Sequence, residues 1–151
     1  MSWRDRWLVW DLDGCLVDNR HRVHLLKQDP PDWASYVQKA GLDAPYYDTQ
    51  ALLFALHASG HFQHAVITGR IEHEGENTKD WLRAHGMDLF AEYHFRKEGD
   101  LRPAPEIKLE IVQQHFSVPY RELVAVFEDH PKTTEVLRGA GIQCLHVREY
   151  R

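Results

Sequence analysis

Short apolar runs alternate with longer amphipathic stretches along the whole chain. The apolar runs cover residues 7–10, 62–67, 123–127 and 144–147, and each has the length of one β-strand. Residues 92–95 form a weaker, short strand pattern. Strands that are separated by helices need right-handed crossovers, and these place the helices on both faces of a parallel sheet. The pattern therefore predicts an α/β fold with a central parallel sheet flanked by helices.

Caps, glycines and prolines delimit the helices between these strands. Asp48 or Thr49 is predicted to cap the first long helix, and Asn77 or Thr78 the second. Pro105 fits the first turn of the third helix, where its missing N–H costs nothing. The helix bodies are expected around residues 51–56, 78–82, 105–115 and 131–141.

One segment, residues 19–45, interrupts the alternation after the first strand. It contains Pro30-Pro31 and Gly41, and short helices are expected over 22–27 and 32–40. About two dozen residues are too few for an independent domain of ordinary size. The sequence of 151 residues therefore predicts a single domain over 1–151 with a small insert.

The composition limits which binding partners and which cellular compartment the protein is expected to have. The net charge of −5 gives no general basic surface, so contact with nucleic acid would depend on a local cluster of arginines. The two cysteines form no disulfide or metal pattern, which fits a reducing compartment. Residues 1–6 are polar and charged, and no apolar run is long enough to span a bilayer. We therefore expect a cytoplasmic protein without a membrane partner.

Two carboxylates follow the first apolar run, at Asp11 and Asp13, and Gly14 comes next. Ligands of a parallel sheet bind beyond the carboxyl ends of its strands, so both acids are expected at the mouth of a site. Carboxylates this close repel each other unless a cation neutralises them, and Mg²⁺ prefers such oxygen ligands. The simpler alternative, a strand that ends in an ordinary Asp-Gly turn, leaves the second acid unexplained.

Further polar residues follow other strands. Thr68 and Arg70 end the second strand, Glu128 and Asp129 end a later one, and Lys108 lies early in the helix between. Each of these residues alone is as well explained by a helix cap or a solvated side chain. Together they supply the cation ligands, hydroxyl and ammonium that a bound phosphate requires.

The sequence at this point resembles the haloacid dehalogenase (HAD) superfamily of phosphohydrolases. The matching segments, in the order of the family, are Asp11-Leu12-Asp13-Gly14, Val66-Ile67-Thr68-Gly69-Arg70, Lys108 and Val126-Phe127-Glu128-Asp129. The resemblance covers nearly the whole chain. It implies a Rossmann-like sheet, here without a large cap domain, and hydrolysis through an aspartyl-phosphate.

The resemblance also implies a role for each motif residue. Asp11 is expected to attack phosphorus, and Asp13 to protonate the leaving oxygen and later activate water. Thr68 and Lys108 are expected to hold the phosphoryl oxygens.

For the metal, the resemblance implies that Asp129 binds Mg²⁺ beside Asp11 and the Asp13 carbonyl, and that Glu128 acts through a metal-bound water. Cys15 stands where the family usually has threonine, so a backbone role would survive there and a hydroxyl role would be lost.

A closer resemblance is to the 3′-phosphatase domain of polynucleotide kinase-phosphatases. The segment Arg96-Lys97-Glu98-Gly99-Asp100-Leu101-Arg102 is similar to an Arg-x-x-Gly-Asp-x-Arg segment of that domain. The residues implied in substrate binding are Arg22, Gly69, Arg70, Arg96 and Arg102. Ala104 departs from the pattern, which has an acidic residue there.

This resemblance implies a Mg²⁺-dependent phosphatase that removes 3′-phosphate from polynucleotide ends. The chain has no Gly-x-x-x-x-Gly-Lys-Ser/Thr loop, so we expect either a stand-alone phosphatase or one that works with a separate kinase or ligase. The insert is small, and an open site would admit a strand end.

Two other functions stay open. One is a small-molecule phosphatase, such as a nucleotidase or sugar phosphatase. The other is a phospho-accepting signalling receiver, which also uses Asp, Thr, Lys and Mg²⁺. The order of the motifs disfavours the receiver, because here the Asp-x-Asp-Gly segment comes first and the acidic pair last.

Overall fold

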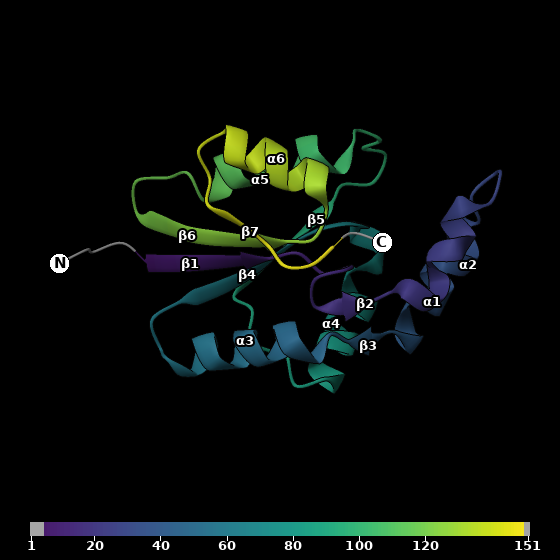
Figure 1. Cartoon of the computed structure of the whole chain (residues 1–151), viewed down its shortest axis with the longest axis horizontal. Coiled ribbons are helices and arrows are strands. Elements are labelled where there is room, and N and C mark those ends of the chain that lie inside the picture. Colours follow the sequence, from purple (N-terminus) through teal and green to yellow (C-terminus); the bar gives the residue numbers. More distant parts are fainter. Residues whose placement is uncertain (1–4, 150–151) are drawn as a thin grey trace.

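A computed structural model of the chain describes residues 5–149. A five-stranded sheet of order β5-β4-β1-β6-β7 forms its centre, and every pair of neighbouring strands is parallel. This architecture confirms the predicted α/β fold (Figure 1). The strands are β1 Asp5–Trp10, β4 Gln63–Ile71, β5 Glu92–Arg96, β6 Arg121–Glu128 and β7 Cys144–His146.

Strand β1 lies in the middle of the sheet and is buried on both faces. Its side chains alternate, so Leu8 and Trp10 belong to one core cluster and Trp7 and Val9 to the other. The Trp10 ring stacks on Phe127 of β6, with ring centroids 3.9 Å apart. A strand covered on both faces reads as a continuous apolar run, which is why the sequence pattern found it.

Four longer helices cover the two faces of the sheet, two on each side (Figure 1). The helices are α3 Tyr47–Ala58 and α4 Gly75–Ala84 on one face, and α5 Ala104–His115 and α6 Pro131–Gly139 on the other. Among residues 5–149, no helix combines the length and apolarity needed to cross a membrane.

The predicted caps of two helices are wrong. Helix α3 begins at Tyr47, its N-cap position is Tyr46, and no side chain caps it, while Asp48 lies in the first turn. Helix α4 begins at Gly75, two residues before Asn77, because a short 3₁₀ turn, Glu72–Glu74, leads into it. Pro105 does lie in the first turn of α5, as predicted.

The insert folds into short helical pieces at the carboxyl end of the sheet (Figure 1). Strand β2, Val17–Asp18, directly precedes the insert, whose described elements are α1 Arg20–Val23, the 3₁₀ turns His24–Lys27 and Lys39–Leu42, α2 Trp33–Gln38 and β3 Ala44–Pro45. β2 and β3 pair as a small antiparallel ribbon that the sequence pattern did not predict. The indole N–H of Trp81 in α4 donates to the carbonyl of Asp43 at 2.9 Å, which ties the insert to the body.

Candidate active site at the carboxyl ends of the strands

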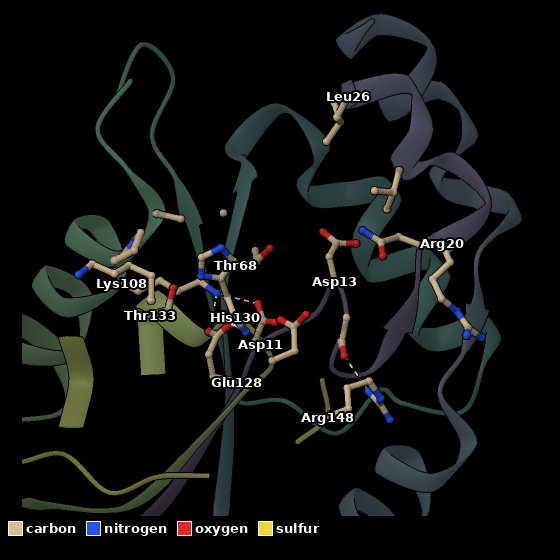
Figure 2. A pocket seen from close by; sticks show the side chains of 18 of the residues that line it. Asp11, Asp13, Arg20, Leu26, Thr68, Lys108, Glu128, His130, Thr133 and Arg148 are labelled. Carbon is tan, nitrogen blue, oxygen red and sulfur yellow. Dashed lines mark hydrogen bonds and ion pairs between the residues drawn. The ribbon is translucent and has the colours of Figure 1, made fainter. Parts of the chain in front are cut away.

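The carboxyl ends of β1, β4 and β6 open into a cavity of about 500 Å³. Figure 2 shows Asp11, Thr68 and Glu128 gathered at its base, with Asp13 across from them and Leu26 of the insert at the rim. The residues that line it include Asp11, Asp13, Gly14, Thr68, Gly69, Lys108, Glu128 and Asp129. Eight residues from three predicted motifs and one helix thus meet at one place, as the strand-end pattern predicted.

A buried acidic cluster forms the base of the cavity. Carboxylate oxygens of Asp11, Glu128 and Asp129 lie within 4.8 Å of one another. Lys108 reaches into the cluster, and its Nζ lies 2.7 Å from Asp11 Oδ1 and 2.7 Å from Glu128 Oε2. One ammonium therefore faces three carboxylates, which leaves two negative charges without a counter-ion when all three are ionised.

The pKa values of the acids in the cluster reflect this excess of negative charge. Burial and the charge of Glu128 raise the pKa of Asp11 well above its usual value, against the opposing effect of Lys108. Burial also raises the pKa of Asp129, to about 6. Asp11 Oδ2 is buried and has no hydrogen-bond partner among the described residues. A dense set of oxygen ligands with two excess negative charges and an unpaired oxygen fits a hard divalent cation.

Gly14 brings the backbone against this cluster. Its φ is +84°, in the left-handed region that favours glycine. A Cβ atom at this position would lie 1.9 Å from Asp129 Oδ2, so no other residue fits without moving that carboxylate. The glycine of the Asp-x-Asp-Gly motif is therefore required both for the turn and for the close approach to Asp129.

Asp13 faces the cavity and is held by two arginines. Arg70 donates to both of its oxygens, at 3.0 Å from Nε and 2.7 Å from Nη2, and Arg22 Nη2 donates to Oδ1 at 3.1 Å. Burial favours the neutral acid, but the charge and hydrogen bonds of Arg70 outweigh it, and Arg22 adds to them. The pKa of Asp13 consequently lies below its usual value.

Both arginines are in turn anchored by Asp43 of the insert. Its side chain is fully buried and accepts hydrogen bonds from Arg22 at 2.9 Å and 2.6 Å, while Arg70 Nη2 lies 3.6 Å from Oδ2. Arg22 and Arg70 thus orient Asp13 and are absent from the described lining of the cavity. The sequence pattern missed Asp43, because an acid in an irregular insert carries no local signal.

Thr68 and Gly69 end the buried part of β4 at the cavity. The Thr68 hydroxyl accepts from the Arg70 backbone N–H at 3.1 Å, which leaves its own proton available to donate. The Gly69 carbonyl accepts a hydrogen bond from Arg96 Nε at 3.1 Å. A Cβ atom at Gly69 would lie 3.8 Å from the Ala104 Cβ. The cavity wall beside Thr68 is therefore built by small residues.

The last two predicted arginines hold the loop that leads into α5. Arg96 Nη1 donates to the carbonyls of Asp100 and Arg102, at 2.8 Å and 2.6 Å. Arg102 pairs with Asp100 and Glu110 and is about half exposed. Neither side chain is among the described residues that line the cavity, whereas Ala104 at the end of the same loop is.

Several cavity residues were not predicted from the sequence. They are Asn19, Arg20, Tyr36, Tyr46, Lys132 and Arg148. Arg148 could have been found, because it follows the last strand at the same carboxyl edge as the other site residues. The side chains of the insert could not, since its irregular path is set by tertiary contacts.

The sequence over residues 5–150 matches the family described as the polynucleotide kinase PNKP phosphatase domain. A comparison with curated proteins gave no match. Among solved structures, one of the Pnkp1/Rnl/Hen1 RNA repair complex is similar with a TM-score of 0.77 and 18% identity, over 97% of this chain and 43% of that chain. A second structure of the Pnkp1/Rnl/Hen1 complex gives a TM-score of 0.79 and 18% identity, over 100% of this chain and 48% of that chain.

A third similar structure is a haloacid dehalogenase-like hydrolase from Streptococcus pneumoniae, with a TM-score of 0.62 and 14% identity over 93% of this chain and 83% of that chain. At these identities the structures establish the fold alone. The chain spans less than half the length of the two complex components it resembles. The sequence match covers nearly the whole chain, and with it the chain belongs to the phosphatase domain family of polynucleotide kinase-phosphatases, within the HAD phosphatases.

Proposed function

We propose that this phosphatase is Mg²⁺-dependent and removes the 3′-phosphate from nucleic-acid ends through an aspartyl-phosphate on Asp11. The observation that carries the metal and the mechanism is the acidic cluster, where Asp11 Oδ2 stays unpaired although Lys108 holds Oδ1. The family match supports the polynucleotide substrate.

Asp11 and Asp129 are the proposed direct ligands of the cation, with the Asp13 carbonyl beside them and Glu128 acting through a water. Their oxygens are close and buried, and they carry the excess charge that a cation would offset. A divalent cation bound there would reduce the repulsion between the Asp11 carboxylate and the substrate phosphate.

In the first step, an oxygen of Asp11 forms a bond to phosphorus and the bond from phosphorus to the ester oxygen breaks. Lys108 fixes the Asp11 carboxylate from the α5 side and is positioned, with Thr68, to hold the phosphoryl oxygens. The departing 3′ oxygen takes a proton from Asp13. In the second step, Asp13 removes a proton from water, the water oxygen attacks phosphorus, and phosphate and the Asp11 carboxylate are released.

Asp13 must be protonated at the moment of the first step, although its arginine partners hold its pKa low in the structure. A phosphate bound between Asp11 and Asp13 adds negative charge beside Asp13, and this favours its neutral form. The arrangement thus links the protonation of the acid to the arrival of the substrate.

The proposed polynucleotide specificity depends on the outer part of the site. A cavity of about 500 Å³ is large enough for more than a phosphoryl group, and residues of the insert form part of its lining. Arg96 ends β5 and Arg102 lies on the loop that leads from β5 to the cavity wall at Ala104, so a strand that leaves the site along this loop would meet them.

A kinase or ligase that acts on the same ends is the proposed partner. Support comes from the similarity of the chain to a component of the Pnkp1/Rnl/Hen1 RNA repair complex. The sequence contains no kinase phosphate-binding loop, so the partner activity must lie outside these residues.

Phosphate release from matched substrates tests the proposal. Oligonucleotides that carry a 3′-phosphate, the same oligonucleotides with a 5′-phosphate, 3′-mononucleotides and sugar phosphates are compared at fixed ionic strength, with Mg²⁺ or with excess chelator. We expect the highest kcat/KM on the 3′-phosphorylated oligonucleotide and no turnover in chelator. A preference for mononucleotides or sugar phosphates would replace the polynucleotide assignment with a small-molecule one, and full turnover in chelator would exclude the metal.

A further inference from the structure

We propose that Arg148 is a positioning residue that holds the loop of residues 13–17 in the shape required for binding Mg²⁺. The inference rests on the metal-dependent function proposed above. It concerns a residue that follows the last strand and that none of the sequence motifs includes.

Arg148 contacts three parts of the chain through one guanidinium. Nη1 donates to the carbonyls of Gly14 and Cys15, at 2.7 Å and 2.9 Å. Nη2 donates to Asp48 Oδ1 at 2.7 Å and to Thr49 Oγ1 at 3.1 Å, both at the start of α3. The same group lies over the Tyr46 ring, 3.6 Å from its centroid. It is therefore fixed on both edges and on one face.

The backbone of the loop shows why these bonds matter. The N–H groups of Cys15, Leu16 and Val17 all donate to the Leu12 carbonyl, at 2.9 Å each, and Gly14 N–H donates to Val17 O at 2.8 Å. The backbone N–H groups of residues 14–17 therefore all have acceptors within the loop. Arg148 supplies donors to the Gly14 and Cys15 carbonyls, and both residues are buried. Buried carbonyls without a donor are costly, so without Arg148 this part of the loop would rotate to find one.

Such a rotation would reach the metal ligands directly. Gly14 is so close to Asp129 that there is no room for a single Cβ between them, and Asp13 precedes it in the same loop. A change in the Gly14 peptide therefore moves Gly14 against the Asp129 carboxylate and redirects the Asp13 carbonyl. Arginine suits this task because Nη1 donates to both carbonyls while Nη2 holds the start of α3, whereas a lysine has a single nitrogen for both tasks.

Mg²⁺ affinity, measured by isothermal titration calorimetry on the whole chain, tests this role. The variants are Arg148→Ala, Arg148→Lys and the control Arg138→Ala. Arg138 also donates to a backbone carbonyl, that of Cys144 at 3.0 Å, but lies outside the described lining of the cavity. Circular dichroism and thermal melting establish that each variant is folded, and kcat and KM are measured on an aryl phosphate, which needs no nucleic-acid contact.

We expect Arg148→Ala to bind Mg²⁺ at least tenfold more weakly and to lose at least tenfold in kcat, with KM within threefold of wild type. Arg148→Lys should fall between Arg148→Ala and wild type, and Arg138→Ala should stay within twofold on all three measures. Wild-type Mg²⁺ affinity in folded Arg148→Ala, or in Arg148→Lys if the alanine variant does not fold, overturns the inference alone. A wild-type protein that binds no Mg²⁺ overturns both the proposed function and this inference.

Discussion

At the scale of single residues, the site separates groups that face the cavity from groups that hold them. Asp11, Asp13, Thr68 and Lys108 line the cavity, whereas Arg22 and Arg70 lie behind Asp13. The sequence placed all of these residues at strand ends or in early helical turns. It could not tell that the arginines turn toward a carboxylate, because their partner Asp43 comes from the insert.

The replacement Asp11→Asn tests the proposed nucleophile. The amide keeps the size of the side chain but removes the charge that attacks phosphorus, so we expect loss of at least about three orders of magnitude in kcat on every substrate. Because Asp11 lies among like charges in a buried cluster, the variant should be at least as stable as wild type when no metal is present. Thermal melting and single-turnover assays measure both effects, and a folded variant with substantial turnover would exclude the covalent mechanism.

Arg96→Ala and Arg102→Ala form a matched pair at the end of β5 and on the loop that follows it. Arg96 donates to three carbonyls, including that of Gly69 in the site, while Nε and Nη2 of Arg102 donate to the carboxylates of Asp100 and Glu110. We therefore expect Arg96→Ala to raise KM on a 3′-phosphorylated oligonucleotide about tenfold, and Arg102→Ala only about twofold. Both variants are also assayed on an aryl phosphate. Equal losses on the two substrates would mean that Arg96 supports the cavity wall and makes no contact with the strand.

At the scale of elements, buried strands were predictable, whereas helix starts were predictable only where a proline marks them, at α5 and α6, and not at α3 and α4. The apolar runs of β1 and β6 are continuous because both strands lie inside the sheet, so periodicity marks them clearly. The start of α4 is shifted to Gly75 by the 3₁₀ turn before it, a turn in which Glu74 Oε2 accepts from the backbone N–H of Ile71 at 3.1 Å. A cap residue such as Thr78 instead becomes a buried side chain that accepts from Arg70 Nη1 at 3.1 Å.

A buried histidine at the contact between β4 and β1 should make the stability of the fold depend on pH. His64 of β4 is buried, its Nδ1 accepts from the Trp10 indole at 3.1 Å, and burial lowers its pKa to about 4. The unfolded chain takes up this proton at its ordinary pKa near 6.5, so stability is present above that pH and is lost as the pH falls toward 4. From pH 7.5 to pH 5 we expect this group to cost about 2 kcal/mol of unfolding free energy.

Urea denaturation of wild type and His64→Leu at the two pH values isolates this contribution. The variant should be less stable than wild type at pH 7.5, because the Trp10 N–H loses its acceptor. Its loss of stability on acidification should be smaller than that of wild type by about 2 kcal/mol. If both proteins lose the same amount, other groups cause the pH dependence and His64 is not the buried neutral base that the structure shows.

At the scale of the whole molecule, the site is assembled from segments far apart in the sequence. Asp11 and Asp129 directly follow β1 and β6, Thr68 lies in β4 and Lys108 in α5. Arg148 reaches the same cavity from the segment after β7. The carboxyl edge of one parallel sheet brings them together, which is why polar residues that follow separate apolar runs could be expected to lie close to one another. The same convergence gathers like charges, so the folded protein carries a local electrostatic cost that a ligand can relieve.

Mg²⁺ should therefore raise the melting temperature. A cation that binds only the folded protein, at a concentration about one hundred times its Kd, stabilises a protein by about 2.7 kcal/mol, which for a chain of this size corresponds to a shift of roughly 5–10 °C.

Asp129→Asn removes one of the three clustered carboxylates and so serves as the matched control. It should melt at a higher temperature than wild type in chelator, because a buried like charge is gone, and it should respond little to Mg²⁺. Differential scanning calorimetry of both proteins, with and without Mg²⁺, gives the comparison. A wild-type melting temperature that Mg²⁺ leaves unchanged would show that Lys108 and protonation of Asp11 or Asp129 already neutralise the cluster.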